Sequence, residues 1–243
     1  MLCLPKRLTY IVGDLHGSVE NLSAILSNSD IWQGLSDQTA QLLFLGDYIH
    51  HRKYAIDDTH SLQLIILLTE LLDSFPEQVF LLRGNHDTVQ EKIVTWGIQI
   101  SERFNTFVSS RFGVDTLKAM GEFFDRLPVV GVGSCFASTH AAPPVSALTL
   151  NEITDLSAVE PQYRQMMWNR DIEPQHISHF LKALGLLPSA MFVSGHHATP
   201  DRQGISKAHR GNRSHLVLQS WQPEALTIAR ADANHVTLFP IAL

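Results

Sequence analysis

Apolar residues in the first 90 positions alternate between short continuous runs and runs with helical spacing. Three β-prone runs predict strands at Leu8–Val12, Gln41–Leu45 and Val79–Leu82. Between them, apolar residues recur every three or four positions after Ser18 and again after Asp58, so we expect two helices that begin at these polar residues. Strands that alternate with helices over short connections form a parallel sheet with helices packed on it.

The rest of the chain predicts more helices and then a strand-rich end. Helical spacing covers Ser101 to Leu127 and stops at Pro128, and another helix is expected over Gln175–Leu184. Further strands are predicted at Val129–Val132, Cys135–Thr139, Met191–Ser194, Leu216–Gln219, Ala225–Ala229 and Val236–Phe239. Because helices do not alternate with the last strands, we expect a second, mixed sheet that faces the first. With no repeat or linker in the sequence, we expect one α/β domain over residues 1–243.

Composition restricts the class of protein. With 44% hydrophobic and 17% charged residues, the chain can bury a core, which excludes disorder as its main state. The net charge of −6 argues against binding nucleic acid by neutralising phosphates. No apolar run reaches the ~18 residues of a membrane span. Two cysteines, and a start without the features of a signal peptide, lead us to expect a cytoplasmic protein without a disulfide framework.

Residues that can bind metals directly follow several predicted strands. The first three strands lead into Gly13-Asp14-Leu15-His16-Gly17, Gly46-Asp47 and Gly84-Asn85-His86-Asp87. Ligands of α/β sheets bind where the carboxyl ends of parallel strands meet, so these loops should converge. Two later strands precede a histidine each. The candidate donors are Asp14, His16, Asp47, Asn85, His140 and His196, enough for two divalent transition-metal ions ~3.5–4 Å apart.

Each of these residues also has an ordinary structural explanation. Asp14 could cap the helix after it, Asp47 could stabilise a turn, and Asn85 could occupy a left-handed turn. A single histidine is more often a core or surface residue than a ligand. The same arrangement in five strand-end loops favours a shared site over five separate coincidences.

Six short segments together resemble a known family. They read GDLHG, GDYI, LLRGNHD, THAAPP, WNR and SGHHATP, in order from about Tyr10 to Pro200. This set is similar to the calcineurin-like metallophosphoesterases of the phosphoprotein phosphatase (serine/threonine phosphatase) family, especially to bacterial and bacteriophage members. The resemblance implies a sandwich of two mixed β-sheets flanked by helices, with a βαβαβ N-terminal half. It also implies two divalent metal ions, with Mn as the first candidate and Fe or Zn as alternatives.

The resemblance further implies the metal ligands. Asp14 and His16 would bind the first ion, and Asp47 would bridge the two ions. The second ion would be completed by Asn85, His140 and His196. Two cations would also offset the crowding of acidic ligands in an acidic protein.

Beside the metals, the sequence departs from the family pattern. His86 matches the general acid that protonates the leaving oxygen after attack by hydroxide, and Arg170 matches a phosphate-binding arginine. The usual Asp-Arg-Gly after the bridging aspartate is replaced by His50, His51 and Arg52. An imidazole at position 50 would disfavour the charged form of His86, whereas the long side chain of Arg52 could still reach the phosphate. We therefore expect these three residues at the substrate-binding site, with a weaker general-acid step.

Other residues could compensate for this departure. Asp87 or Asp58 could replace the missing aspartate as the partner of His86. His197, directly after His196, could lie behind the ligands or face the substrate. The order of residues alone does not decide between these alternatives.

The sequence leaves three functions open. The leading interpretation is a metal-dependent phosphatase for phosphomonoesters, either small phosphoesters or phosphorylated proteins, with phosphoserine and phosphothreonine as first candidates. A hydrolase of dinucleoside polyphosphates or other nucleotides would use the same metals, and an aromatic slot near Trp96 or Trp168 would favour it. A non-catalytic module that recognises phosphate is supported only by loss of the Asp-Arg pair. The groove that distinguishes substrates is expected in Lys53–Asp58, Thr95–Ser110 and Ala141–Asp155.

Overall fold

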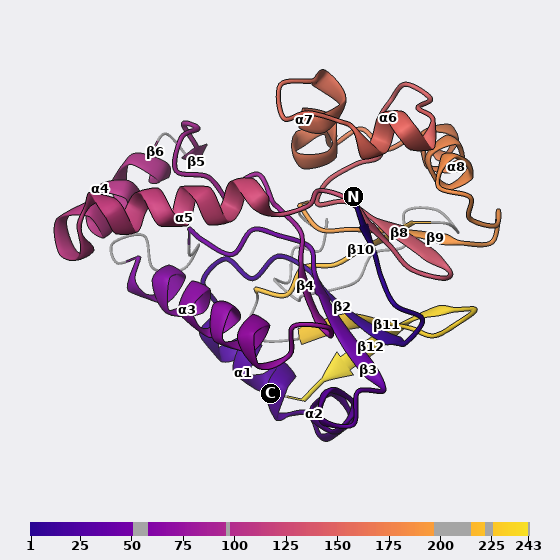
Figure 1. Ribbon diagram of the computed structural model, residues 1–243, viewed down its shortest axis with the longest axis horizontal. Coiled ribbons are helices and arrows are strands. Elements are labelled where there is room, and N and C mark those ends of the chain that lie inside the picture. Colours follow the sequence, from indigo (N-terminus) through magenta and orange to yellow (C-terminus); the bar gives the residue numbers. More distant parts are fainter. Residues whose placement is uncertain (51–57, 96–97, 197–214, 222–225, 243) are drawn as a thin grey trace.

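The computed structural model describes residues 1–50, 58–95, 98–196, 215–221 and 226–242. Two five-stranded sheets lie between two groups of helices (Figure 1). A separate two-stranded ribbon of β5 (Val94–Thr95) and β6 (Ile98–Gln99) precedes helix α4. The predicted α/β sandwich of two mixed sheets is confirmed.

The first sheet has the strand order β12-β11-β2-β3-β4. Its parallel part consists of β2 (Leu8–Val12), β3 (Ala40–Phe44) and β4 (Val79–Leu81), close to the predicted bounds. Strands β11 (Leu226–Ala231) and β12 (Val236–Ile241) extend it in antiparallel orientation, with β11 paired to β2. The expectation that these last two strands belong to the second sheet is therefore wrong. Strand β11 pairs with β2, which would otherwise be an open sheet edge, and β12 pairs with β11.

The second sheet has the strand order β1-β7-β8-β9-β10. Its members are β1 (Leu2–Cys3), β7 (Gly131–Val132), β8 (Phe136–Ser138), β9 (Met191–Ser194) and β10 (His215–Val217). Only the pair of β7 and β8 is antiparallel among the described strands of this sheet. The carboxyl ends of β8, β9 and β10 therefore point the same way.

Helices cover the outer faces of both sheets. Those on the first sheet are α1 (Val19–Ser27), α2 (Ser29–Ser36), α3 (Thr59–Ser74), α4 (Ile100–Phe112) and α5 (Val114–Arg126). Those on the second are α6 (Leu150–Thr154), α7 (Pro161–Trp168) and α8 (Pro174–Ala183). Sequence periodicity predicted α1, α3, α8 and the region of α4 and α5. It missed α2, α6 and α7, which have at most eight residues each and so show little periodicity.

Three buried apolar clusters fill the three interfaces between these layers. Side chains such as Leu64 and Phe104 lie between the first sheet and its helices. Leu43 and Phe136 belong to the cluster between the two sheets. Phe192 packs in the third cluster, between the second sheet and α6–α8. The middle cluster holds the sheets against each other, so that strand ends from both sheets can contribute to one site.

Two local expectations need correction. The segment Thr95–Ser110, expected as a groove loop, is mostly helix α4. Asp58 precedes α3 as expected but makes no side-chain cap, because its buried carboxylate accepts a hydrogen bond from Arg103 Nε at 3.3 Å. Ser18 likewise stands before α1 without a side-chain cap. A buried carboxylate gains more from a guanidinium than from helix amides, because both partners are charged.

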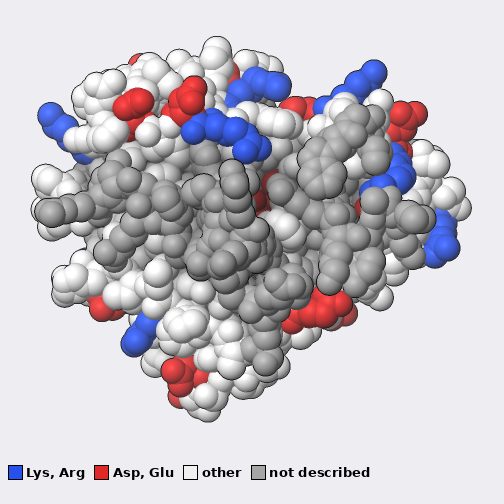
Figure 2. All heavy atoms as spheres, turned by 180° about the vertical axis from the view of Figure 1, so that it is seen from behind, with Lys and Arg blue, Asp and Glu red and all other residues white. Residues whose placement is uncertain are grey.

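Two observations concern the surface. None of the helices within the described ranges combines the length and apolarity needed to cross a membrane. On the face shown in Figure 2, acidic and basic side chains of the described residues are interspersed rather than gathered in a single patch.

Candidate metal centre

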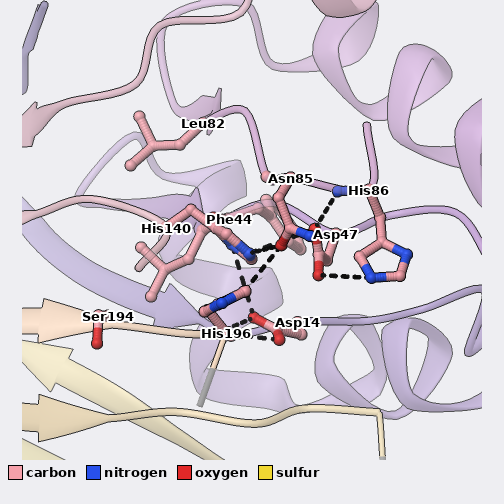
Figure 3. A network of polar contacts seen from close by, with 12 residues as sticks. Asp14, Phe44, Asp47, Leu82, Asn85, His86, His140, Ser194 and His196 are labelled. Carbon is pink, nitrogen blue, oxygen red and sulfur yellow. Dashed lines mark hydrogen bonds and ion pairs between the residues drawn. The ribbon is translucent and has the colours of Figure 1, made fainter. Parts of the chain in front are cut away.

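The six predicted donors lie together where strands of both sheets end, and Figure 3 labels five of them: Asp14, Asp47, Asn85, His140 and His196. Loops after β2, β3 and β4 carry the first four, and the segments after β8 and β9 carry the two histidines. All six are buried, as is His86 beside them. Two groups of three donors have ligand atoms within 4.8 Å of one another: His16, Asp47 and His86, and Asp47, His140 and His196. Asp47 belongs to both groups, which is the position of a bridging carboxylate.

The two oxygens of Asp47 face histidines from different loops. Oδ2 lies 3.5 Å from Nε2 of His16, and Oδ1 lies 3.3 Å from Nε2 of His140. These two histidines come from different sheets, after β2 and after β8. The carboxylate therefore stands between two potential metal positions.

Backbone carbonyl groups fix the orientation of these two histidine rings. His140 Nδ1 lies 3.0 Å from the carbonyl oxygen of Leu45, and His16 Nδ1 lies 3.3 Å from that of Ile49. A carbonyl oxygen only accepts, so each Nδ1 must carry the proton and donate it. Each Nε2 then presents a lone pair toward carboxylate oxygens, an arrangement that needs a proton or a cation between the two atoms.

The remaining donors lie around His140 and His196. Asn85 Oδ1 lies 2.9 Å from Nε2 of His140 and 2.8 Å from Nδ1 of His196. Both oxygens of Asp14 accept the backbone N–H of His196 at 3.0 Å. A Cβ on Gly195 would collide with the Asp14 carboxylate, so the glycine allows this close approach.

Several of these residues have backbone angles that are uncommon outside glycine. His16, Asp47, His50 and His196 have φ values of 43°, 56°, 67° and 62°. Such conformations cost ~1–3 kcal/mol each and persist only where the surroundings hold them. The strain occurs in the loops after β2, β3 and β9, as is common at functional sites.

The charges of the site are balanced by protons when the chain is considered alone. Burial would raise the pKa of Asp47, but the charges of His140, His86 and His16 lower it well below 3.8. Burial would lower the pKa of His140, but Asp47, Asp14 and Asp87 raise it to about 9. Burial and then the charge of Asp47 raise the pKa of Asp87 to about 7. A cation beside Asp47 would replace the proton on His140 and relieve the repulsion at Asp87, so this donor set fits divalent metals.

His50 and His86 form a pair of imidazoles beside the metal donors. Their Nδ1 atoms lie 2.9 Å apart, so one ring donates and the other accepts. His50 therefore lies where the missing family aspartate was expected, next to the predicted general acid. Burial and then the charge of His86 lower the pKa of His50 to about 3, so this ring is neutral at physiological pH. The His50 ring also packs against the ring of Phe104 in a T-shaped arrangement, with centroids 5.5 Å apart.

The two carboxylates considered as substitutes for that aspartate have other partners. Asp58 pairs with Arg103. Asp87 accepts backbone N–H groups from Asp47, Tyr48 and Gly84. His50 is the side chain whose contact with the His86 ring is described, through the two Nδ1 atoms.

Of the other predicted substrate-binding residues, only Arg170 lies within the described residues. Arg170 is exposed, two positions after Trp168, whose indole ring lies edge-on to His196 with centroids 6.4 Å apart. Trp168 also packs partly on the third apolar cluster, which agrees with a supporting role. Trp96, His51, Arg52 and His197 lie outside the described residues, as does most of Lys53–Asp58.

Two residues that follow β10, Ser220 and Trp221, were given no role by the sequence interpretation. Ser220 Oγ accepts the N–H of Gly13, and its own N–H donates to the carbonyl oxygen of Asp14, both at 3.0 Å. Trp221 lies edge-on to His16, with ring centroids 6.4 Å apart. The signal was available, because Gln219 and Ser220 are polar residues directly after an apolar run, like the other strand-end loops.

Comparison with known proteins agrees with this architecture. The calcineurin-like phosphoesterase family matches residues 8–219. The PP2A-like serine/threonine-protein phosphatase PPG1 of Candida albicans is 34% identical over 145 residues, which are 59% of this chain and 31% of that protein. The chain spans about a third of the length of the curated relatives that it matches.

Solved structures show the same fold at low sequence identity. A serine/threonine phosphatase from Saccharomyces cerevisiae with similarity to human PP5 aligns with a TM-score of 0.73 and 13% identity, over 100% of this chain and 84% of that one. A cold-active protein-tyrosine phosphatase from a psychrophilic Shewanella species aligns with a TM-score of 0.59 and 12% identity, over 99% and 82% of the two chains. At such identities the likeness establishes the fold alone.

Proposed function

Because the chain belongs to the calcineurin-like phosphoesterase family, we propose that it is a dinuclear metal-dependent phosphatase that hydrolyses phosphomonoesters. The observation that carries the proposal is the placement of Asp47. Its two oxygens face the Nε2 atoms of His16 and His140, whose tautomers are fixed by backbone carbonyl groups. Such outer hydrogen bonds are typical of histidines that bind metals.

In this proposal the donors divide between two ions, with Asp47 shared. Asp14 and His16 hold the first ion, and the second is held by Asn85, His140 and His196. Two bound divalent cations would lower the pKa of a water molecule and neutralise phosphoryl oxygens, so no nucleophilic side chain is required. Mn is the first candidate and Fe or Zn the alternatives, because carboxylate, amide and imidazole donors suit all three.

The chain itself supplies substrate orientation and the proton for the leaving oxygen. His86 lies next to Asp47 but at the more exposed rim, with Nε2 4.0 Å from Oδ2 and 9% of its surface exposed. It can therefore hold a proton toward a substrate oxygen while Nδ1 contacts His50. Arg170, exposed near Trp168, is proposed to bind the phosphate together with Arg52.

We propose phosphoserine and phosphothreonine of proteins as the first substrates to test. The support is the similarity to a PP2A-like phosphatase over 59% of the chain. A groove along α4 is lined by Gln99, Glu102, Arg103, Thr106 and Phe107. The same helix carries Phe104, which packs against His50, and we propose that this groove admits the substrate peptide. Small phosphoesters would be accepted by the same centre.

The test is hydrolysis of p-nitrophenyl phosphate by metal-stripped protein with and without added Mn²⁺. Asp47→Asn is the matched variant, since it keeps the size of the side chain and removes the charge shared by both ions. We expect Mn²⁺-dependent turnover that falls by at least ~10³-fold in the variant. Metal binding without turnover would refute the phosphatase and leave a module that recognises phosphate.

A further inference from the structure

The carboxylate of Asp87 joins two of the ligand loops. Its Oδ2 accepts the N–H groups of Asp47 and Gly84, and its Oδ1 accepts that of Tyr48, each at 2.8 Å. Asp87 and Gly84 belong to the loop after β4, whereas Asp47 and Tyr48 belong to the loop after β3. The side chain is completely buried, so no water competes for these bonds.

A reciprocal bond runs in the opposite direction between the same loops. The Asp47 carboxylate accepts the backbone N–H of His86 at 2.9 Å. A Cβ on Gly84 would collide with the backbone nitrogen and carboxylate of Asp47, and a Cβ on Gly46 would collide with the backbone of Gly84. The loops can therefore lie in direct backbone contact, each held by the aspartate of the other.

The same peptide groups also hold the first ligand loop. The carbonyl oxygen of Asp47 accepts the N–H of His16 at 2.7 Å, and that of Tyr48 accepts the N–H of Gly17 at 2.8 Å. Residues 47 and 48 thus bond to Asp87 through their N–H groups and to the loop after β2 through their carbonyl groups. The N–H of Tyr48 and the carbonyl group of Asp47 belong to one peptide unit, so a change at Asp87 can reach His16 through that unit.

We propose that Asp87 is the positioning residue that holds the loops after β2, β3 and β4 in the arrangement needed to bind metal. It does so by fixing the backbone of Asp47, whose φ of 56° lies in the left-handed region. The functional importance of Asp87 depends on the proposed metal centre. Its first test needs no metal, so the two ideas can fail separately.

Asp87→Asn is the informative change because it keeps the size of the side chain and removes one acceptor. Three N–H groups face Asp87, and an amide offers one oxygen and one NH₂ group. In the better orientation, the amide oxygen accepts the N–H groups of Asp47 and Gly84. The NH₂ group then faces the N–H of Tyr48, so two donors meet without an acceptor. The matched control is Asp125→Asn, which breaks the ion pair of Arg83 with α5 at 3.0 Å. Arg83 also donates to the backbone oxygen of Asp87, so the control disturbs the same region and leaves the carboxylate of Asp87 intact.

The first measurement is amide hydrogen exchange of the metal-free protein. We expect Asp87→Asn to speed exchange at Tyr48 and Gly17 by at least tenfold, while Leu43 in β3 keeps its wild-type rate. The amide of Leu43 reports global stability, so a general loss of folding would move all three together. Asp125→Asn should leave Tyr48 and Gly17 unchanged. Equal rates in wild type and Asp87→Asn, or equal acceleration in the two variants, would overturn the proposal.

The second measurement is Mn²⁺ binding by calorimetry and electron paramagnetic resonance. Loss of a side chain that supports metal ligands typically lowers metal affinity 10–100-fold, and we expect this for Asp87→Asn. The spectrum should change from that of two coupled Mn²⁺ ions to that of isolated ions, because Asp47 no longer bridges. Wild-type affinity and spectrum in Asp87→Asn would overturn the proposal. Wild type that binds two Mn²⁺ but hydrolyses no phosphoester would refute the proposed function and leave the role of Asp87 standing.

Discussion

Replacing His50 by Asp tests whether the imidazole at this position limits proton donation by His86. The two rings meet through their Nδ1 atoms at 2.9 Å. Burial, followed by the charge of His86, lowers the pKa of His50 to about 3, so His50 is neutral at every pH of the assay described below. A neutral ring can accept a proton from His86 but provides no negative charge to hold that proton in place.

The size of the effect follows from the tautomer that His50 must adopt. When His86 carries protons on both nitrogens, His50 accepts at Nδ1 and must keep its own proton on Nε2. That Nε2 atom is buried and has no hydrogen-bond partner in the described part of the chain. A buried N–H without an acceptor costs ~1–3 kcal/mol, which at ~1.4 kcal/mol per unit equals roughly one to two pH units. A carboxylate has no such tautomer and attracts the imidazolium directly.

The assay compares kcat/KM from pH 5 to 10 for wild type, His50→Asp and His50→Asn. A general acid acts only while protonated, so activity falls as pH rises through its titration. We expect His50→Asp to move this alkaline limb upward by about one to two pH units on a phosphoserine peptide. The effect should be smaller on p-nitrophenyl phosphate, because its acidic phenol leaves without a proton. His50→Asn removes the same ring and the same tautomer cost without adding charge, so it should move the limb upward by less than His50→Asp does.

A displacement in His50→Asn as large as that in His50→Asp would show that the carboxylate charge adds nothing, and no displacement in His50→Asp would refute the whole reasoning. Both variants lose the ring contact with Phe104, so a difference between them cannot come from packing. Rates on the two substrates that change by the same factor would show that proton donation is not the step affected.

Three further outcomes are expected. Mn²⁺ affinity should rise with pH up to about 9, by as much as ~10-fold per unit. Although burial lowers the pKa of His140, the neighbouring aspartates raise it to about 9, and its Nε2 proton must leave before that atom can bind metal. Calorimetry at pH 6, 7.5 and 9 checks this. Gly195→Ala should lower Mn²⁺ affinity at least ~10-fold by pushing the Asp14 carboxylate aside, whereas Gly131→Ala, whose added Cβ would approach the Leu43 side chain at 3.3 Å, should not; the same titration compares them. Arg170→Ala should raise both KM for p-nitrophenyl phosphate and the inhibition constant of inorganic phosphate by about tenfold, with kcat little changed. An unchanged inhibition constant would exclude Arg170 from the phosphate site.

Much of the site was predictable because its geometry follows from local sequence. The donors come directly after apolar strands, and parallel strands in one sheet must end at the same edge. This reasoning brings Asp14, Asp47 and Asn85 together without knowledge of distances. Placing His140 beside them requires the second sheet to pack with its strand ends at the same edge, which the family resemblance implied and the structure shows.

The parts that were not predictable depend on contacts between distant segments. Strand β1 has two residues, and its identity rests on pairing with β7 more than 120 positions later. The membership of β11 in the first sheet is decided by its pairing with β2, which no local pattern encodes. The role of Asp87 was also hidden, because an aspartate after a histidine gives no indication that its partners are amides of another loop.

The unusual residue at position 50 and the clustered metal donors can coexist because different bonds hold them in place. The backbone of Asp47 and Tyr48 is fixed by Asp87 and by the loop after β2, and the side chain of His50 takes no part in those bonds. A change at position 50 can therefore alter proton donation without disturbing the ligands. This separation predicts opposite results for two variants: His50→Asp should change the pH profile at unchanged Mn²⁺ affinity, whereas Asp87→Asn should lose Mn²⁺ affinity. A large loss of Mn²⁺ affinity in His50→Asp would show that the pair of imidazoles and the metal donors form one unit after all.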